Sequence, residues 1–242
     1  MKALFIFKLG STFPDTAARL GDFDRWTASA LAGSNVPVAV VDVEHGEPLP
    51  AMSRCAGVVM TGSHAMVTDN LPWSVGLEGW LRDAVDDAVP ILGVCYGHQL
   101  LARATGGRVD YHATGREIGT VEIRTLQACA DDALFGAVPG SFLAHTTHAQ
   151  SVLELPPGAV HLATNAYERN HAFRLGESAW GVQFHPEFDT QVMREYIGGL
   201  AAQLEAAGRD VERLLGEVTE TPIAAGILGQ FGALVAARHR DN

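Results

Sequence analysis

The chain has 242 residues, of which 47% are hydrophobic and 19% are charged. This length and composition suit one large domain that buries its own core, and they exclude intrinsic disorder. Seventeen lysines and arginines against 28 aspartates and glutamates give a formal charge of −11, which opposes broad binding to nucleic-acid phosphates.

Cysteine usage and apolar segments indicate the compartment. The three cysteines, Cys55, Cys95 and Cys129, are an odd number at irregular spacing, unlike a secreted disulfide framework. Residues 1–8 lack the long apolar region and cleavage site of a signal peptide. Residues 222–238 are apolar but fall short of the ~20 residues that span a membrane. We therefore expect a cytoplasmic protein, and a buried terminal helix at residues 222–238.

Apolar, β-branched runs alternate with segments of helical period in the N-terminal part of the chain. Strands are expected at residues 3–7, 36–43, 57–60 and 91–94, and helices at residues 16–31 and 75–89. This alternation indicates a parallel sheet with helices on both faces. Ligand sites of such sheets lie at the carboxyl ends of the strands.

The sequence changes character after Gly106, where short Gly-rich strands indicate a more antiparallel continuation of the same sheet. These strands are expected at residues 108–111, 119–125, 161–164, 172–175 and 180–184, and outer helices at residues 191–208 and 211–218. The predicted fold is α/β: a single three-layer domain with a mixed, mostly parallel central sheet flanked by helices, plus C-terminal helices. Residues 1–190 would form the main domain and residues 191–242 a helical extension packed on it.

Residues 90–102 combine a buried strand, a tight turn and a helix that is expected to begin near His98. Glycines stand two positions before and two after Cys95, as in the nucleophile elbow of hydrolases. Small residues there let the strand and helix approach, and the helix N-terminus favours the reactive thiolate. A buried strand-end cysteine is the alternative, and we assign that structural role to Cys55 and Cys129.

A thiol nucleophile needs a base, and the base needs an orienting group. The strand predicted at residues 180–184 leads directly into His185, Pro186 and Glu187. Proline stops the strand ladder, so the glutamate can turn back toward the imidazole. A structural histidine is the alternative for His185. Cys95 and His98 could also form half of a zinc site, but the chain offers no second pair at metal-ligand spacing.

These motifs resemble the class I glutamine amidotransferases, in particular the amidotransferase part of guanosine monophosphate synthase and its stand-alone relatives. The resemblance covers about residues 3–188, and its strongest motifs are Gly-Val-Cys-Tyr-Gly-His-Gln and Gln-Phe-His-Pro-Glu. It implies a flavodoxin-like fold with no cofactor and no metal. It also implies that Cys95 attacks the glutamine carboxamide, that His185 transfers protons and that Glu187 orients His185.

The resemblance also implies substrate-binding positions. Gln99 would contact bound glutamine, and the amides of Gly62 and Tyr96 would face the oxyanion. The chain departs here from a frequent Gly-Gly-Pro pattern, because Gly62 stands between a threonine and a serine. The backbone of a short segment would hold the α-amino and carboxylate groups of glutamine, namely Thr147, His148, Ala149 and Gln150. From the residues alone, Gly62 could equally be a turn glycine at the end of a strand. Gln99 could be a polar residue in the first turn of a helix, and residues 147–150 could form a structural turn.

The expected function is hydrolysis of glutamine to glutamate and ammonia through a thioester at Cys95. A separate synthase subunit would accept the ammonia, or the chain would act alone; residues 1–242 contain no P-loop signature. The first alternative is a γ-glutamyl peptide or conjugate hydrolase with the same triad. The second is a non-catalytic regulatory protein that retains the fold. No nucleic-acid or membrane partner is expected.

Overall fold

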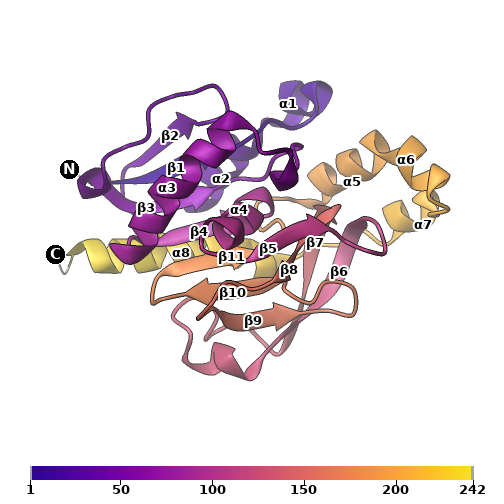
Figure 1. Cartoon of the computed structure of the whole chain (residues 1–242). Helices are drawn as coiled ribbons and strands as arrows, with labels where there is room; N and C mark the ends of the chain where they lie inside the picture. The colour runs from indigo at the N-terminus through magenta and orange to yellow at the C-terminus, as the bar shows by residue number, and fades with distance from the viewer. Residues whose placement is uncertain (1, 241–242) are drawn as a thin grey trace.

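A twisted sheet lies between two layers of helices in the computed structural model, which describes residues 2–240 (Figure 1). The order of its strands is β2-β1-β3-β4-β11-β10-β9-β6-β7. The parallel part comprises β2 (Val38–Asp42), β1 (Ala3–Lys8), β3 (Cys55–Met60), β4 (Ile91–Val94) and β11 (Ala179–Val182). The antiparallel part continues from β11 through β10 (Ala172–Leu175), β9 (Val160–Thr164), β6 (Glu117–Thr125) and β7 (Ser141–His148). The predicted mixed α/β sheet is confirmed.

Helices cover both faces of this sheet, and a smaller group lies beyond one of its ends (Figure 1). One face carries α2 (Phe23–Leu31) and α8 (Pro222–Arg240), and the other carries α3 (Pro72–Asp86) and α4 (Tyr96–Ala104). The remaining helices are α1 (Pro14–Leu20), α5 (Thr190–Gly199), α6 (Ala201–Ala206) and α7 (Val211–Gly216). Short 3-10 turns occupy Met52–Arg54, Val67–Asp69 and Gln127–Asp131.

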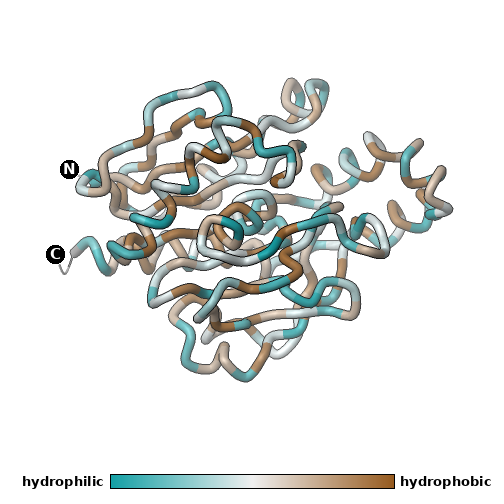
Figure 2. Tube along the Cα trace, in the orientation of Figure 1, coloured by the Kyte–Doolittle hydropathy of each residue, from teal (hydrophilic) through white to brown (hydrophobic). Residues whose placement is uncertain are grey.

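Successive side chains along the strands point to opposite faces of the sheet and contribute to two separate cores. In β1, Leu4 and Ile6 join the core beneath α8, whereas Phe5 and Phe7 join the core beneath α3 and α4. Figure 2 shows hydrophobic residues along the central strands and hydrophilic ones in many of the outer loops. A third core joins α5, α6 and α7 to Phe23 of α2. Hydrophobic cores therefore pack against both faces of the sheet.

Several helix predictions are wrong in their boundaries. Helix α3 covers Pro72–Asp86 rather than residues 75–89, and the helix expected at residues 191–208 is interrupted at Leu200, between α5 and α6. The helix expected at residues 16–31 is divided into α1 and α2, because Gly21 adopts a φ of 89° and the Asp22 carboxylate accepts a hydrogen bond from the Phe23 amide. Helix α4 begins at Tyr96, two residues before the expected start, so its N-cap is Cys95 itself. The thiol is thus closer to the helix N-terminus than the sequence indicates.

The second half of the chain differs most from expectation. Strand β7 was not predicted, and neither was β8 (Gln150–Glu154), which pairs with β5 (Arg108–Tyr111) in a separate two-stranded sheet. The expected extension of one sheet through residues 108–111 is therefore wrong. Strand β11 ends at Val182 rather than at residue 184, although the Gln183 and His185 amides still donate to the His171 and His145 carbonyls.

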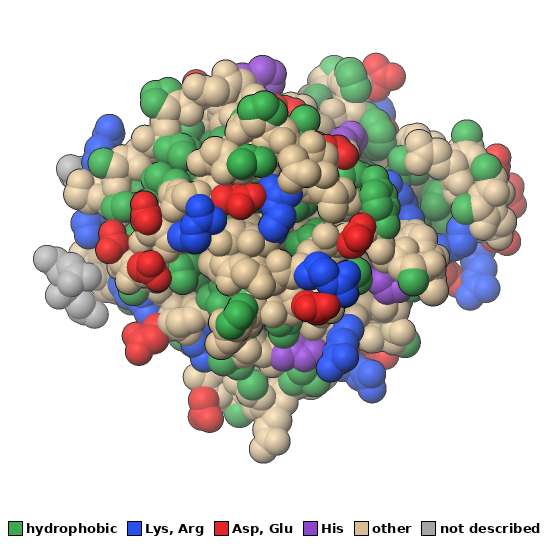
Figure 3. All heavy atoms as spheres, viewed as in Figure 1, with side chains coloured by type: hydrophobic (Ala, Val, Ile, Leu, Met, Phe, Trp, Pro, Cys, Tyr) green, Lys and Arg blue, Asp and Glu red, His purple; other side chains and the backbone are tan. Residues whose placement is uncertain are grey.

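The surface gives few further indications of function. On the face in Figure 3, acidic and basic side chains are interspersed rather than collected in a basic patch. None of the helices between residues 2 and 240 combines the length and apolar character of a membrane span. Within the same residues, no group of three or more His, Cys, Asp or Glu side chains is placed to hold a metal ion.

Candidate active site

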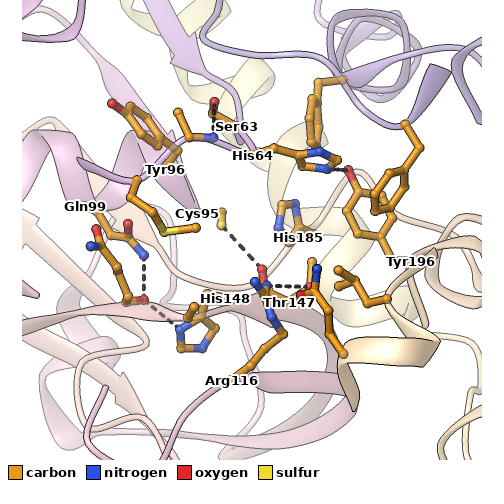
Figure 4. Close-up of a pocket in the computed structure, with 18 residues that line it drawn as sticks. Ser63, His64, Cys95, Tyr96, Gln99, Arg116, Thr147, His148, His185 and Tyr196 are labelled. Carbon is orange, nitrogen blue, oxygen red and sulfur yellow. Dashed lines mark hydrogen bonds between the residues drawn. The ribbon is translucent and has the colours of Figure 1, made fainter. Parts of the chain in front are cut away.

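Cys95 lies at the carboxyl end of β4, which pairs with β3 on one side and with β11 on the other. Its backbone adopts a φ of 50° and a ψ of −99°, a conformation that non-glycine residues rarely adopt. This sharp turn points the side chain away from the strand and into a cavity of about 230 Å³. The Cys95 sulfur lies 3.9 Å from the Thr147 carbonyl oxygen, at the centre of Figure 4.

The glycines on either side of Cys95 have the close contacts that the motif predicts. A β-carbon at Gly93 would lie 2.5 Å from the Gly97 carbonyl oxygen, and one at Gly97 would lie 2.6 Å from the β-carbon of Met60. Both approaches are too short for any side chain. Glycine therefore lets β4, α4 and β3 meet around the turn that exposes Cys95.

His185 and Glu187 lie beside Cys95 and come from the segment that follows β11. The imidazole Nδ1 of His185 lies 2.7 Å from a Glu187 carboxylate oxygen, and both side chains are 2% exposed. The other ring nitrogen, Nε2, is buried and has no hydrogen-bond partner within the described part of the chain. His185 and Cys95 line the same cavity (Figure 4). The structure thus brings together the three residues of the predicted triad.

The electrostatics of this group favour a charged imidazole. Burial on its own would lower the pKa of His185, but the Glu187 carboxylate and the Cys95 sulfur outweigh it and raise that pKa to about 10. A cationic His185 next to Cys95 stabilises negative charge on the sulfur. Outside the site, burial raises the pKa of Cys55 to about 11 and also raises that of Cys129.

Gln99 and Gln150 are among the predicted substrate-binding residues, and both line the cavity. The Gln99 amide nitrogen donates to the Gln150 carbonyl oxygen at 2.7 Å and to the Gln183 side chain at 2.9 Å. The Gln150 side chain bonds in turn to Thr68. The amide hydrogens of Gln99 are therefore engaged within the protein, and its side-chain oxygen is the atom that could accept a bond from a ligand.

Thr147, His148 and Ala149 form the corner between β7 and β8 and line the same cavity. The His148 ring does not face Cys95. Its Nδ1 lies 2.9 Å from the Gln150 carbonyl oxygen, and its Nε2 lies 3.1 Å from a Glu117 carboxylate oxygen. His148 thus fixes the corner from behind, and the backbone of the corner borders the cavity.

The predicted oxyanion donors, Tyr96 and Gly62, belong to two adjoining segments, since the Gly97 amide donates to the Thr61 carbonyl oxygen at 3.3 Å. The Tyr96 amide is the first of α4 and has no acceptor inside the helix, while its hydroxyl donates to Ser74 at 2.7 Å. Gly62 follows β3, and a β-carbon on it would lie 3.0 Å from Cε1 of His185 and 3.2 Å from the Phe23 ring. The loop therefore packs tightly against the proposed base.

We expect Gly62→Val to lower glutamate release by about 10² to 10³-fold, because it displaces one oxyanion donor and crowds His185. Thermal unfolding should change much less than turnover. Gly140→Val is the matched control, since nothing lies within 4 Å of a β-carbon there. Equal losses of stability and activity in Gly62→Val would show that Gly62 is only a turn residue.

Several residues of the cavity were not predicted from the sequence. Arg116 directs its guanidinium to the Thr147 hydroxyl at 3.5 Å, and no carboxylate lies within 4.0 Å of it among residues 2–240. His64 and Tyr196 lie on the other side of Cys95 from Gln99 (Figure 4). The Phe13 ring packs against both of theirs. No sequence motif marks these residues, which reach the site from separate segments.

The structure also places His98, the second member of the possible zinc pair. Its ring packs 4.9 Å from that of Phe173, and a β-carbon on Gly181 would lie 2.6 Å from its Nδ1. Burial lowers the pKa of His98 to about 3. This histidine is a neutral core residue under α4, on the face that packs against the sheet.

The mixed sheet with a cysteine at the turn after β4 agrees with the fold of known glutamine amidotransferases. A family model described as glutamine amidotransferase class-I matches residues 21–198, so the chain belongs to that family. A solved glutamine amidotransferase of Methylobacillus flagellatus is similar, with a TM-score of 0.73 and 27% identity over 100% of this chain and 95% of that chain. One from Thermotoga maritima shares the fold, with a TM-score of 0.73 and 20% identity over 99% of this chain and 98% of that chain.

The curated relatives include glutamine-hydrolysing GMP synthases. A GMP synthase subunit of Methanopyrus kandleri is 32% identical over 142 residues, which are 58% of this chain and 71% of that protein. The GMP synthase of Porphyromonas gingivalis is 33% identical over 137 residues, which are 56% of this chain but only 26% of that protein. The matched part is thus about a quarter of the longer synthase.

Proposed function

We propose that the chain hydrolyses the side-chain amide of glutamine, or the equivalent amide of a γ-glutamyl compound, through a thioester at Cys95. One observation carries this proposal: a strained elbow presents Cys95 to a cavity beside His185, whose Nδ1 is held by Glu187 at 2.7 Å. Family membership supports the same chemistry.

In the proposed mechanism, the Cys95 thiolate attacks the amide carbonyl, and the resulting oxyanion faces the amides of Tyr96 and Gly62. His185 gives its Nε2 proton to the leaving nitrogen, the C–N bond breaks, and an amine and the γ-glutamyl thioester result. His185 then takes a proton from water, whose hydroxide attacks the thioester. The C–S bond breaks, glutamate is released, and the Cys95 thiolate is restored.

The polar end of the cavity suits the glutamyl group. Arg116 is a cation without a carboxylate partner among the described residues, and it lies beside the corner at Thr147. We propose that it neutralises the substrate α-carboxylate. The side-chain oxygen of Gln99 and the backbone of the corner through Gln150 would receive the α-amino group.

A relative supports a proposal for the ammonia acceptor. The Methanopyrus kandleri protein is, by its name, one subunit of a glutamine-hydrolysing GMP synthase. We propose that a separate synthase subunit receives the ammonia from this chain if glutamine is its substrate. We also propose a cytoplasmic location. We further propose that residues 1–190 form a main domain and that residues 191–242 are a helical extension of it. Residues 1, 241 and 242 of that division lie outside the described residues.

A γ-glutamyl conjugate is the second candidate substrate, because the cavity extends beyond Cys95 to an apolar side at Phe13 and Leu200. A glutamyl group with ammonia as its leaving group would not use that side. A non-catalytic protein is the remaining alternative, and it gives no physical reason for the strain at Cys95 or for the His185–Glu187 pair.

Alkylation tests the proposal. A glutamine-like chloroketone should modify Cys95, with glutamine slowing the reaction in proportion to its binding, while Cys55 and Cys129 stay unmodified because burial raises the pKa of both. Peptide mass mapping identifies the labelled cysteine. Labelling that substrate does not slow, or labelling spread over all three cysteines, would favour the non-catalytic alternative.

A further inference from the structure

The cavity has two chemically different ends, with Cys95 between them. The polar end contains Gln99, Arg116 and the corner from Thr147 to Gln150. The residues here called the apolar wall are Phe13, His64, Tyr196 and Leu200, and Gln203 of α6 also lines the cavity. In Figure 4, His64 and Tyr196 lie beyond His185, on the side away from Gln99. A ligand that fills the cavity would therefore have a polar and an apolar part.

The apolar wall is a packed arrangement of rings. The Phe13 ring lies 4.6 Å from that of His64 and 5.1 Å from that of Tyr196, and Nε2 of His64 lies 3.1 Å from the Tyr196 hydroxyl oxygen. Phe13 also packs on Gly199, where a β-carbon would lie 2.9 Å from its ring. These contacts join the loop before α1, the loop after β3 and helix α5, and they hold the wall in place before any ligand binds.

Packed aromatic rings connect the apolar wall to the proton donor. The ring of Phe188 lies 4.1 Å from that of His185 and 4.8 Å from that of Tyr196. His185 must reach the leaving nitrogen to protonate it. Any group attached to that nitrogen would then extend on the His185 side of Cys95, toward the wall.

The charges around the cavity restrict what that group can be. No aspartate or glutamate occurs among the described lining residues, so a cationic amine would find no partner. Arg116 is the only lysine or arginine among the described lining residues, and the α-carboxylate of the glutamyl group would already pair with it. An amino acid as leaving group would bring a second carboxylate without a second cation. A neutral, apolar amine fits the wall best.

Resting on the proposed function, we propose that the apolar wall is a leaving-group subsite, and that the preferred substrates are γ-glutamyl amides of apolar or aromatic amines rather than glutamine or γ-glutamyl peptides. The wall suits a small molecule because it is recessed: Tyr196 is 2% and Leu200 9% exposed, so neither projects toward a protein partner.

Four substrates test the subsite by glutamate release: glutamine, γ-glutamylmethylamide, γ-glutamylbenzylamide and γ-glutamylphenylalanine. Burial of the phenyl ring should raise kcat/KM for the benzylamide at least about tenfold above the methylamide. The phenylalanine conjugate carries the same ring plus a carboxylate and should be cleaved more slowly than the benzylamide. Equal values for methylamide and benzylamide would overturn the subsite.

Variants locate the preference. Phe13→Ala should lower the benzylamide-to-methylamide ratio about tenfold, and Phe13→Leu, which keeps more of the packing on Gly199, should lower it less. Leu143→Ala is the control, because Leu143 is 40% exposed on β7 outside the cavity and should leave the ratio unchanged. A ratio that Phe13→Ala does not change would overturn the proposal, as would an equal change in the control.

A binding measurement separates this proposal from the proposed function. Cys95→Ala protein should bind the benzylamide about tenfold more tightly than the methylamide in calorimetry. Turnover of glutamine with no preference for the benzylamide would leave the proposed function standing and remove the subsite. Absence of hydrolysis of all four amides, with the binding preference intact, would remove the proposed function and retain an apolar binding site. Equal binding of both amides would overturn the subsite in either case.

Discussion

Replacing Cys95 with alanine is expected to abolish glutamate release and leave the fold intact. The substitution removes only the sulfur from a side chain that is 6% exposed, while the chemistry needs the thiolate. Turnover should fall by about 10⁵-fold or more, as in other enzymes that lose their nucleophile. A coupled glutamate assay and thermal unfolding measure the two effects.

Cys55→Ala is the matched control for this prediction. Cys55 is 4% exposed at the start of β3 and does not line the cavity, so the same substitution there should leave turnover unchanged. Ordinary turnover by Cys95→Ala would remove the triad assignment altogether. Unfolding of Cys95→Ala without similar unfolding of Cys55→Ala would show that Cys95 supports the elbow as a structural residue.

Glu187→Gln should slow acylation by about 10² to 10⁴-fold while substrate affinity changes little. Glutamine keeps the shape of the side chain but removes the charge that stabilises cationic His185 at 2.7 Å. The loss should be smaller than in Cys95→Ala, because the helix N-terminus and the oxyanion donors remain. Single-turnover thioester formation, followed against pH in both proteins, measures it. Unchanged acylation at every pH would leave a dyad of Cys95 and His185.

The same substitution has a defined pH signature. The pKa of His185 is raised from 6.5 to about 10, so its protonation contributes stability that is full below about pH 6.5 and is lost as the pH rises through about 10. Glu187→Gln should therefore destabilise the protein most at low pH, and the two unfolding curves should converge above about pH 10. The high-pH decline of acylation should also move to lower pH in the variant.

Local sequence patterns predicted the elbow because its constraints are local. Gly93 and Gly97 are required within a few residues of Cys95, and His185 and Glu187 are separated only by a proline. Alternation of strands and helices predicted the parallel part of the sheet for the same reason. Gly21 and Asp22 are typical helix-ending and helix-starting residues and indicate the break between α1 and α2. The apolar spacing continues across them, so the sequence predicted one helix.

The remaining features depend on contacts between distant segments. Strand β7 ends in buried polar residues such as His145 and His148, which do not alternate with apolar ones, so no strand period marked it. Arg116 and Phe13 enter the site only because the residue before β6 and the loop before α1 both lie close to Cys95. Such residues have no motif, and their function follows from tertiary packing.

Rapid acid quenching of the protein during turnover of glutamine or a γ-glutamyl amide, followed by peptide mass spectrometry, tests the central claim most directly. We expect the peptide that contains Cys95 to gain the mass of one glutamyl group early in the reaction, to lose it as glutamate appears, and to remain unmodified in Cys95→Ala protein. Glutamate release with Cys95 unmodified at every time point, or a glutamyl adduct on another residue, would contradict the proposed mechanism.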